Sequence, residues 1–123
     1  MASNLFSLEG KVAVVTGASR GFGRAIALGL ADAGADIVLA ARTESSLQEV
    51  AAEIETKGRR ALAVPADMGS KESVSNLATK TIEAFGKVDI LVNNAGLGSN
   101  VPFLKMTEDE WDRILDVNLK GYF

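Results

Sequence analysis

The sequence predicts one α/β domain with a doubly wound parallel sheet, and three observations carry that prediction. Short apolar runs alternate along the 123 residues with segments of helical period, as they do when a crossover helix follows each parallel strand. A glycine-rich stretch, TGASRGFG, joins the first apolar run to the first helical segment. No Gly/Ser-rich linker divides the chain. We therefore expect a doubly wound parallel sheet with helices on both faces.

Four apolar runs are the expected strands. They are nearly continuous in apolar residues rather than alternating, which is typical of parallel strands that are buried on both faces. Right-handed crossovers between them would place helices on both sides of the sheet. The runs are KVAVVT at 11–16, DIVLAA at 36–41, RALAVPA at 60–66 and VDILVNN at 88–94.

Three helices are expected between these strands, and a glycine marks the end of each. The first covers about 21–33 and stops at Gly34, and the third stops at Gly86. The second ends at Lys57, where Gly58 would take a left-handed conformation. Helical spacing gives the second and third helices an apolar face, made of Leu47, Val50, Ala51 and Ile54 and of Val74, Leu77, Ala78 and Phe85.

A fourth helix is expected to begin near Thr107. Thr107 and Glu110 match a capping box, and Met106 and Trp111 stand where a hydrophobic staple would form. One polar residue, Asn118, shares the apolar stripe of this helix. A buried amide needs hydrogen-bond partners, so the residues alone favour a core asparagine bonded to nearby backbone. The apolar members of the stripe are Trp111, Ile114, Leu115, Leu119 and Tyr122.

Composition narrows the possible functions. The hydrophobic content of 47% is ample for a core, and a net charge of -3 offers no basic field for nucleic acid or anionic lipid. The chain has no cysteine and no histidine, which excludes disulfides, a Ser-His-Asp triad and most zinc sites, so we expect no metal. The N-terminal residues do not have the pattern of a signal peptide, and no segment approaches a membrane span. A cytoplasmic protein is the expectation.

The glycine-rich turn is the first candidate binding site. It lies between the first strand and the first helix, where backbone N–H groups and the helix dipole converge on an anion. Gly17 would allow the tight turn, Gly21 would let a pyrophosphate approach the backbone, and Gly23 would let the helix pack closely on the sheet. Three glycines alone also fit a plain tight loop. Their place after the first strand of an alternating fold favours the binding turn.

Three ordered motifs resemble those of the classical short-chain dehydrogenases/reductases. TGASRGFG is similar to the cofactor motif of that family, NNAG at 93–96 to its fourth-strand motif, and DRILDVNLKG at 112–121 to the helix that carries its active-site asparagine. The three motifs span nearly the whole chain. The nearest members in pattern are 3-oxoacyl-carrier-protein reductases and gluconate or sugar dehydrogenases. The resemblance implies hydride transfer between a nicotinamide cofactor and a ketone or secondary alcohol.

The resemblance also implies that part of the machinery lies outside these residues. Members of the family are about twice as long, and their catalytic serine and Tyr-x-x-x-Lys pair follow the asparagine helix. The only tyrosine here, Tyr122, is not followed by a lysine four residues later, so we interpret it as an aromatic residue on a helix face. We expect residues 1–123 to be a dinucleotide-binding half-domain, truncated within that helix and catalytically incomplete alone. It would form the first half of a doubly wound sheet, with strand order 3-2-1-4. The alternative is a non-catalytic, self-associating half-domain or nucleotide-binding module.

The family's cofactor contacts can be carried over to this chain. Asp67 and the backbone amide of Met68 would hold the adenine amino group, although Asp67 or Ser70 could instead cap the third helix. Asn118 would be the catalytic relay residue that positions a water beside the catalytic lysine. The turn residues expected to contact cofactor are Gly17, Ser19, Arg20, Gly21, Phe22 and Gly23.

The NNAG motif is expected to serve both the sheet and the cofactor. In the family its first asparagine, here Asn93, ties neighbouring strands together. Ala95 and Gly96 keep the floor low beneath a ribose. Asn93 and Asn94 could also simply form a turn after the strand.

The second strand favours NADP(H) over NAD(H). NAD-binding members of this fold carry an acidic residue at the end of that strand, which would repel a 2′-phosphate. Here Ala40 and Ala41 end the strand and Arg42 follows, while Arg20 in the glycine turn can reach the same region. Solvated surface arginines are the alternative.

The fourth strand also predicts a partner. In the first half of the sheet it becomes an edge, and VDILVNN lacks the proline and most of the charge that protect natural edges. We therefore expect a homo-oligomer or association with a complementary C-terminal half.

Overall fold

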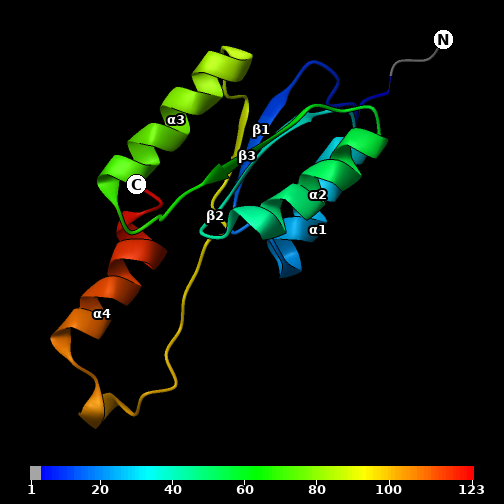
Figure 1. Cartoon of the computed structure of the whole chain (residues 1–123). Coiled ribbons are helices and arrows are strands. Elements are labelled where there is room, and N and C mark those ends of the chain that lie inside the picture. Colours follow the sequence, from blue (N-terminus) through cyan, green and yellow to red (C-terminus); the bar gives the residue numbers. More distant parts are fainter. Residues whose placement is uncertain (1–3) are drawn as a thin grey trace.

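The computed structural model describes residues 4–123 and shows a layered α/β architecture (Figure 1). Four parallel strands form one sheet: β1 (Val12–Thr16), β2 (Asp36–Ala41), β3 (Ala61–Pro65) and β4 (Ile90–Val92). Their order is β3-β2-β1-β4, which confirms the predicted fold class and strand order.

Helices cover both faces of the sheet (Figure 1). α1 (Gly21–Asp32) and α2 (Glu44–Thr56) lie on one face and α3 (Lys71–Phe85) on the other, as right-handed crossovers require. After β4 come a short 3-10 turn (Phe103–Lys105), α4 (Glu108–Leu115) and a π-helical turn (Asp116–Lys120). No helix among residues 4–123 has both the length and the apolar character that a bilayer crossing needs.

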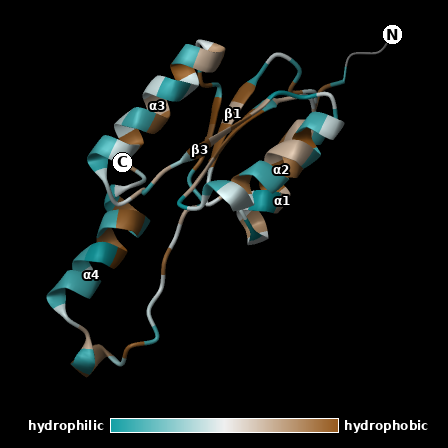
Figure 2. Ribbon diagram, in the orientation of Figure 1, coloured by the Kyte–Doolittle hydropathy of each residue, from teal (hydrophilic) through white to brown (hydrophobic). Residues whose placement is uncertain are grey.

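Alternate residues of β1, β2 and β3 supply two separate apolar layers. In β1, Ala13 and Val15 pack with α1 and α2, whereas Val12 and Val14 pack toward α3. Figure 2 shows the strands as the apolar centre, with many hydrophilic residues on α2 and α3 on either side. Burial on both faces thus explains the continuous apolar runs of the central strands β1 and β2.

The predicted helix ends are found in the structure. Gly58 and Gly86 have φ of +78° and +77°, as left-handed residues after α2 and α3. The hydroxyl of Thr107 accepts a hydrogen bond from the N–H of Glu110 at 3.2 Å, so Thr107 caps α4. The Glu110 carboxylate accepts a hydrogen bond from the Ser99 hydroxyl. Of the two hydrogen bonds of the predicted capping box, the one accepted by the Thr107 hydroxyl is therefore present. The Glu110 carboxylate bonds Ser99 instead of the Thr107 N–H.

Two elements differ from the prediction. β4 has three residues instead of seven, because its pairing with β1 covers only Ala13 to Val15 and the chain then turns away. Ile90 and Val92 are half-buried and Leu91 is exposed, since β4 is the edge of the sheet. The fourth helix changes to a π-helical turn at Asp116, where the Gly121 N–H donates to the Asp116 carbonyl at 2.6 Å.

Candidate functional site

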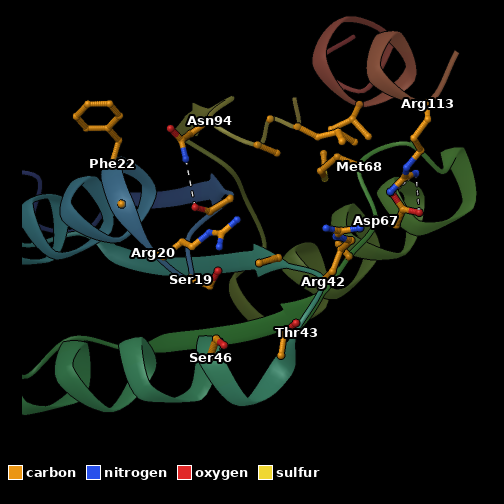
Figure 3. A pocket seen from close by; sticks show the side chains of 18 residues that line it. Ser19, Arg20, Phe22, Arg42, Thr43, Ser46, Asp67, Met68, Asn94 and Arg113 are labelled. Carbon is orange, nitrogen blue, oxygen red and sulfur yellow. Dashed lines mark hydrogen bonds and ion pairs between the residues drawn. The ribbon is translucent and has the colours of Figure 1, made fainter. Parts of the chain in front are cut away.

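A cleft of about 500 Å³ opens where the four strands end (Figure 3). The loops after all four strands contribute to its lining, together with side chains of α4 and the π-helical turn. Ligands of open α/β sheets bind in such a crevice at the carboxyl ends of the strands. The predicted site residues that line it are Gly17, Ser19, Arg20, Gly21, Phe22, Arg42, Asp67, Met68, Ala95 and Gly96.

The glycine turn has the geometry that a bound anion would need. Gly17 and Gly21 have φ of +62° and +56°, and a side chain at Gly21 would meet nothing within 4 Å. Arg20 occupies the N-cap position of α1 without a side-chain cap, and the first turn of α1 has no acidic residue. The N–H groups at this helix end are thus available to an external acceptor.

Gly23 lies behind the cleft lining and serves packing. A side chain there would collide with the Gly17 carbonyl and lie 2.6 Å from Nδ2 of Asn94. The close approach predicted between helix and sheet is therefore an approach of α1 to its own turn and to the end of β4.

Two arginines face the cleft from neighbouring loops (Figure 3). Arg20 and Arg42 are both exposed, and among residues 4–123 neither guanidinium takes part in a hydrogen bond or ion pair. Thr43 and Ser46, at the start of α2, line the same part of the cleft. Two cations and two hydroxyls form a surface suited to a phosphate.

Asp67 is held in place by several donors. Its Oδ1 accepts from the Gly69 N–H at 2.9 Å, and Nη1 of Arg113 lies 2.9 Å from Oδ1 and 3.1 Å from Oδ2. Burial alone would raise the pKa of this carboxyl. The Gly69 N–H and the Arg113 guanidinium, assisted by the charge of Arg42, lower the pKa more and hold it below its usual value.

Of the two residues predicted as possible caps of α3, Asp67 and Ser70, Ser70 is the one that caps it. The side chain of Ser70 caps α3 by accepting from the Ser73 N–H at 3.3 Å. Asp67 is left to face the cleft.

The tie between β1 and β4 is made by Asn94, so the expectation for Asn93 was wrong. Nδ2 of Asn94 donates to the carbonyls of Thr16 and Gly17, both at 3.2 Å. The buried Thr16 hydroxyl accepts from the N–H groups of Asn94 and Ala95 at 3.0 and 2.9 Å. Neighbouring residues of an extended chain point to opposite sides, so Asn93 lines a separate apolar groove beside α3.

Asn118 pairs with the backbone of Leu97. Its Oδ1 accepts from the Leu97 N–H at 2.8 Å, and its Nδ2 donates to the Leu97 carbonyl at 2.7 Å. This is the satisfied asparagine that the apolar stripe suggested. The Tyr122 hydroxyl likewise donates to the Ala95 carbonyl at 2.6 Å, so the π-helical turn and its end are fastened to the loop after β4.

Sequence reasoning missed several residues of the cleft. Arg113 is the most consequential, because it contacts Asp67 across a gap of many residues along the chain. No local pattern singles it out, since an arginine on the polar side of a helix is ordinary. The other missed residues are Ala41, Thr43, Ser46, Ala66, Asn94, Leu97 and Val117.

Within residues 4–123 no group of three acidic side chains forms a metal site.

Known proteins of one family are similar to this chain in sequence. Residues 11–123 match the family described as short chain dehydrogenase. The 2-dehydro-3-deoxy-D-gluconate 5-dehydrogenase of Escherichia coli (strain K12) is 42% identical over 123 residues, which are 100% of this chain and 48% of that protein. The chain spans about half the length of the curated relatives that it matches.

Solved structures of similar proteins have the same fold as this chain. The L-sorbose reductase from Gluconobacter frateurii, complexed with NADPH and L-sorbose, has 40% identity and a TM-score of 0.91, covering 95% of this chain and 45% of that one. A short chain dehydrogenase from Burkholderia cenocepacia J2315 in complex with NADP has 44% identity and a TM-score of 0.89, covering 93% and 47%.

Proposed function

The chain belongs to the short chain dehydrogenase family, and from that premise we propose that its cleft binds the adenosine and pyrophosphate part of NADP(H). The protein's reaction would be hydride transfer between nicotinamide and a ketone or secondary alcohol. Residues 1–123 form the dinucleotide-binding half of this machinery. The nicotinamide, when bound, supplies or accepts the hydride.

The uncapped start of α1 carries the proposal. Its N–H groups lack a side-chain cap, the space in front of Gly21 is open, and the helix dipole favours an anion there. A pyrophosphate satisfies all three conditions. Ser19 and Phe22 belong to the same turn and line the same cleft.

The two exposed arginines support NADP(H) over NAD(H). A 2′-phosphate placed between Arg20 and Arg42 would gain charge-assisted hydrogen bonds that a free ribose hydroxyl cannot match. The two structures described above contain NADPH and NADP, which is consistent with this assignment.

The other end of the adenosine would lie beside β3 and β4. Asp67 would accept a hydrogen bond from the adenine amino group and the Met68 N–H would donate to the ring, while Ala95 and Gly96 leave room for a ribose. Asn93 would not contact the nucleotide, because it faces the other side of the sheet.

Catalysis needs groups that these 123 residues do not supply. Asn118 is the catalytic residue that the family resemblance assigns, and its side chain is committed to Leu97. The sequence contains no Tyr-x-x-x-Lys pair. We expect the chain alone to bind nucleotide without turnover. A cytoplasmic location stays a prediction from the sequence.

A self-associating module is the second candidate function. Val88 and Leu91, at the edge strand, are 44% and 55% exposed and line an apolar groove of about 200 Å³. Natural edges are seldom left so apolar. Association with a second copy or a complementary half would cover this surface.

The experiment that tests nucleotide binding uses two matched glycine variants. Gly21→Asn keeps a residue that tolerates positive φ but places a side chain in the proposed pyrophosphate path. Gly58→Asn makes the same exchange at φ +78°, also in open space, at the far end of the sheet. Calorimetric titration with NADPH should show at least a tenfold loss for Gly21→Asn alone. Equal affinity of both variants and the wild type would overturn the proposal.

A further inference from the structure

Arg113 connects α4 to the wall of the cleft through one carboxylate. Its guanidinium reaches from α4 down to Asp67, which follows β3 (Figure 3). The contact joins residues 46 positions apart, with Nη1 at 2.9 and 3.1 Å from the two carboxylate oxygens. Both side chains line the cleft.

The backbone beside this contact is shaped to admit the guanidinium. A Cβ built at Gly69 would lie 2.5 Å from Nη1 of Arg113 and 3.1 Å from Val117. Gly69 has no positive φ, so its conformation does not demand glycine. The space is what requires the small residue, because Arg113 occupies it.

Stability is a weak explanation for this ion pair. The side chains of Arg113 and Asp67 keep 36% and 40% of their surface exposed, and pairs so exposed contribute little to folding. Because the contact fixes a carboxylate that lines the cleft, it is better explained by the ligand that this carboxylate would bind.

Counting acceptor positions shows what remains for a ligand. An ionised carboxylate has about four lone-pair positions. Oδ1 of Asp67 accepts from Gly69 and Arg113, and Oδ2 accepts from Arg113, so one position stays open on Oδ2. The open position attracts an N–H donor and repels a carbonyl oxygen.

We propose that Arg113 is a positioning residue that orients Asp67 so that its remaining acceptor selects a base with an exocyclic amino group, adenine, over one with an oxo group, hypoxanthine. The inference rests on the proposed NADP(H) function. Arg113 does not touch the base in this arrangement. It holds the carboxylate of Asp67 through contacts with both oxygens, and the lowered pKa of Asp67 agrees with that contact.

Paired titrations test the inference. The probes are NADP+ and its analogue in which hypoxanthine replaces adenine, titrated into the full 123-residue chain. Wild type should prefer NADP+ by about tenfold or more, the value expected for one hydrogen bond to a charged group. Arg113→Gln should reduce that preference to about twofold, and Arg113→Lys should restore part of it. Arg59→Gln, the same exchange at the opposite end of the sheet, should behave as wild type.

A second variant and a spectroscopic measurement separate positioning from folding. Gly69→Ala displaces the guanidinium without removing its charge and should also lower the preference for adenine. NMR titration of the Asp67 carboxyl carbon should show a higher pKa in Arg113→Gln than in wild type, since one of its two cationic neighbours is lost and Arg42 remains.

The outcomes distinguish the inference from the function on which it rests. If wild type binds neither dinucleotide, the proposed function fails and the inference with it. If wild type binds both equally, or if Arg113→Gln and Gly69→Ala discriminate as wild type does, nucleotide binding stands and the role of Arg113 is refuted.

Discussion

Replacing Arg42 with alanine should weaken NADPH binding by about ten- to a hundredfold and leave NADH binding nearly unchanged. The two dinucleotides differ only at the 2′-position of the adenosine ribose, where NADPH carries a phosphate. Arg42 follows β2 and lines the cleft beside Arg20, so the phosphate is the group that it would contact.

The magnitude follows from the surroundings of Arg42. A hydrogen bond to a charged partner contributes about 1.5–3 kcal/mol, which corresponds to the fold-change given above. Arg42 is exposed, and solvent screens its charge, so the lower part of the range is expected. Arg20 would still contact the phosphate in the variant, which also limits the loss.

Calorimetric titration of NADPH and NADH into wild type, Arg42→Ala and Arg59→Ala measures the effect. Arg59 carries the same charge but lies just before β3, at the opposite end of the sheet, so its removal controls for net charge. Equal affinity of wild type for both dinucleotides, or an equal loss of both in Arg42→Ala, would refute the assignment of Arg42 to the phosphate.

Four further predictions follow from the structure. Asn94→Ala should lower the free energy of unfolding by about 1–2 kcal/mol in urea denaturation because two carbonyl contacts are lost, while Asn93→Ala should change it less. Folding lowers the pKa of Asp67, so the ionised Asp67 stabilises the folded chain fully above the unfolded pKa of about 4. This stabilisation is lost as the pH falls through the folded pKa. Asp67→Asn should remove that part of the acid dependence in thermal melts. The 123-residue chain should not oxidise NADPH with any of a panel of ketones, whereas turnover by protein of verified mass would contradict the proposed division of the machinery. Light scattering at tens of micromolar should show a dimer or larger species, and Leu91→Lys at the edge strand should shift it toward monomer; a wild-type monomer would refute association.

The features that sequence reasoning predicted well are those that neighbouring residues decide. The parallel sheet follows from the alternation of apolar runs and helices, and the left-handed glycines at 58 and 86 follow from the local end of a helical period. The strand order is confirmed as well, but it was predicted from the doubly wound fold of the family and not from neighbouring residues. The conformation of the glycine turn is also decided locally, because its three glycines lie within residues 17–23, directly after β1. The family resemblance is likewise confirmed, since the matched residues cover nearly the whole chain.

The features that sequence reasoning missed depend on how distant segments of the chain are placed in three dimensions. Choosing between Asn93 and Asn94 requires the residue at which β4 ends, because a shift of one residue reverses the side of an extended chain. The contact of Arg113 with Asp67 depends on how the long segment after β4 returns α4 to the cleft. The π-helical turn at 116–120 leaves no signal in the apolar period.

Amide NMR of the 123-residue chain titrated with NADP+ tests most directly whether the cleft at the carboxyl ends of the strands binds NADP(H). The largest shifts should lie in the glycine turn at 17–23, after β2 at 41–46, and after β3 and β4 at 66–68 and 94–97. Amides of the apolar groove, such as Leu77 and Leu91, should change little. No shifts at millimolar NADP+, or shifts confined to that groove, would contradict binding in the cleft.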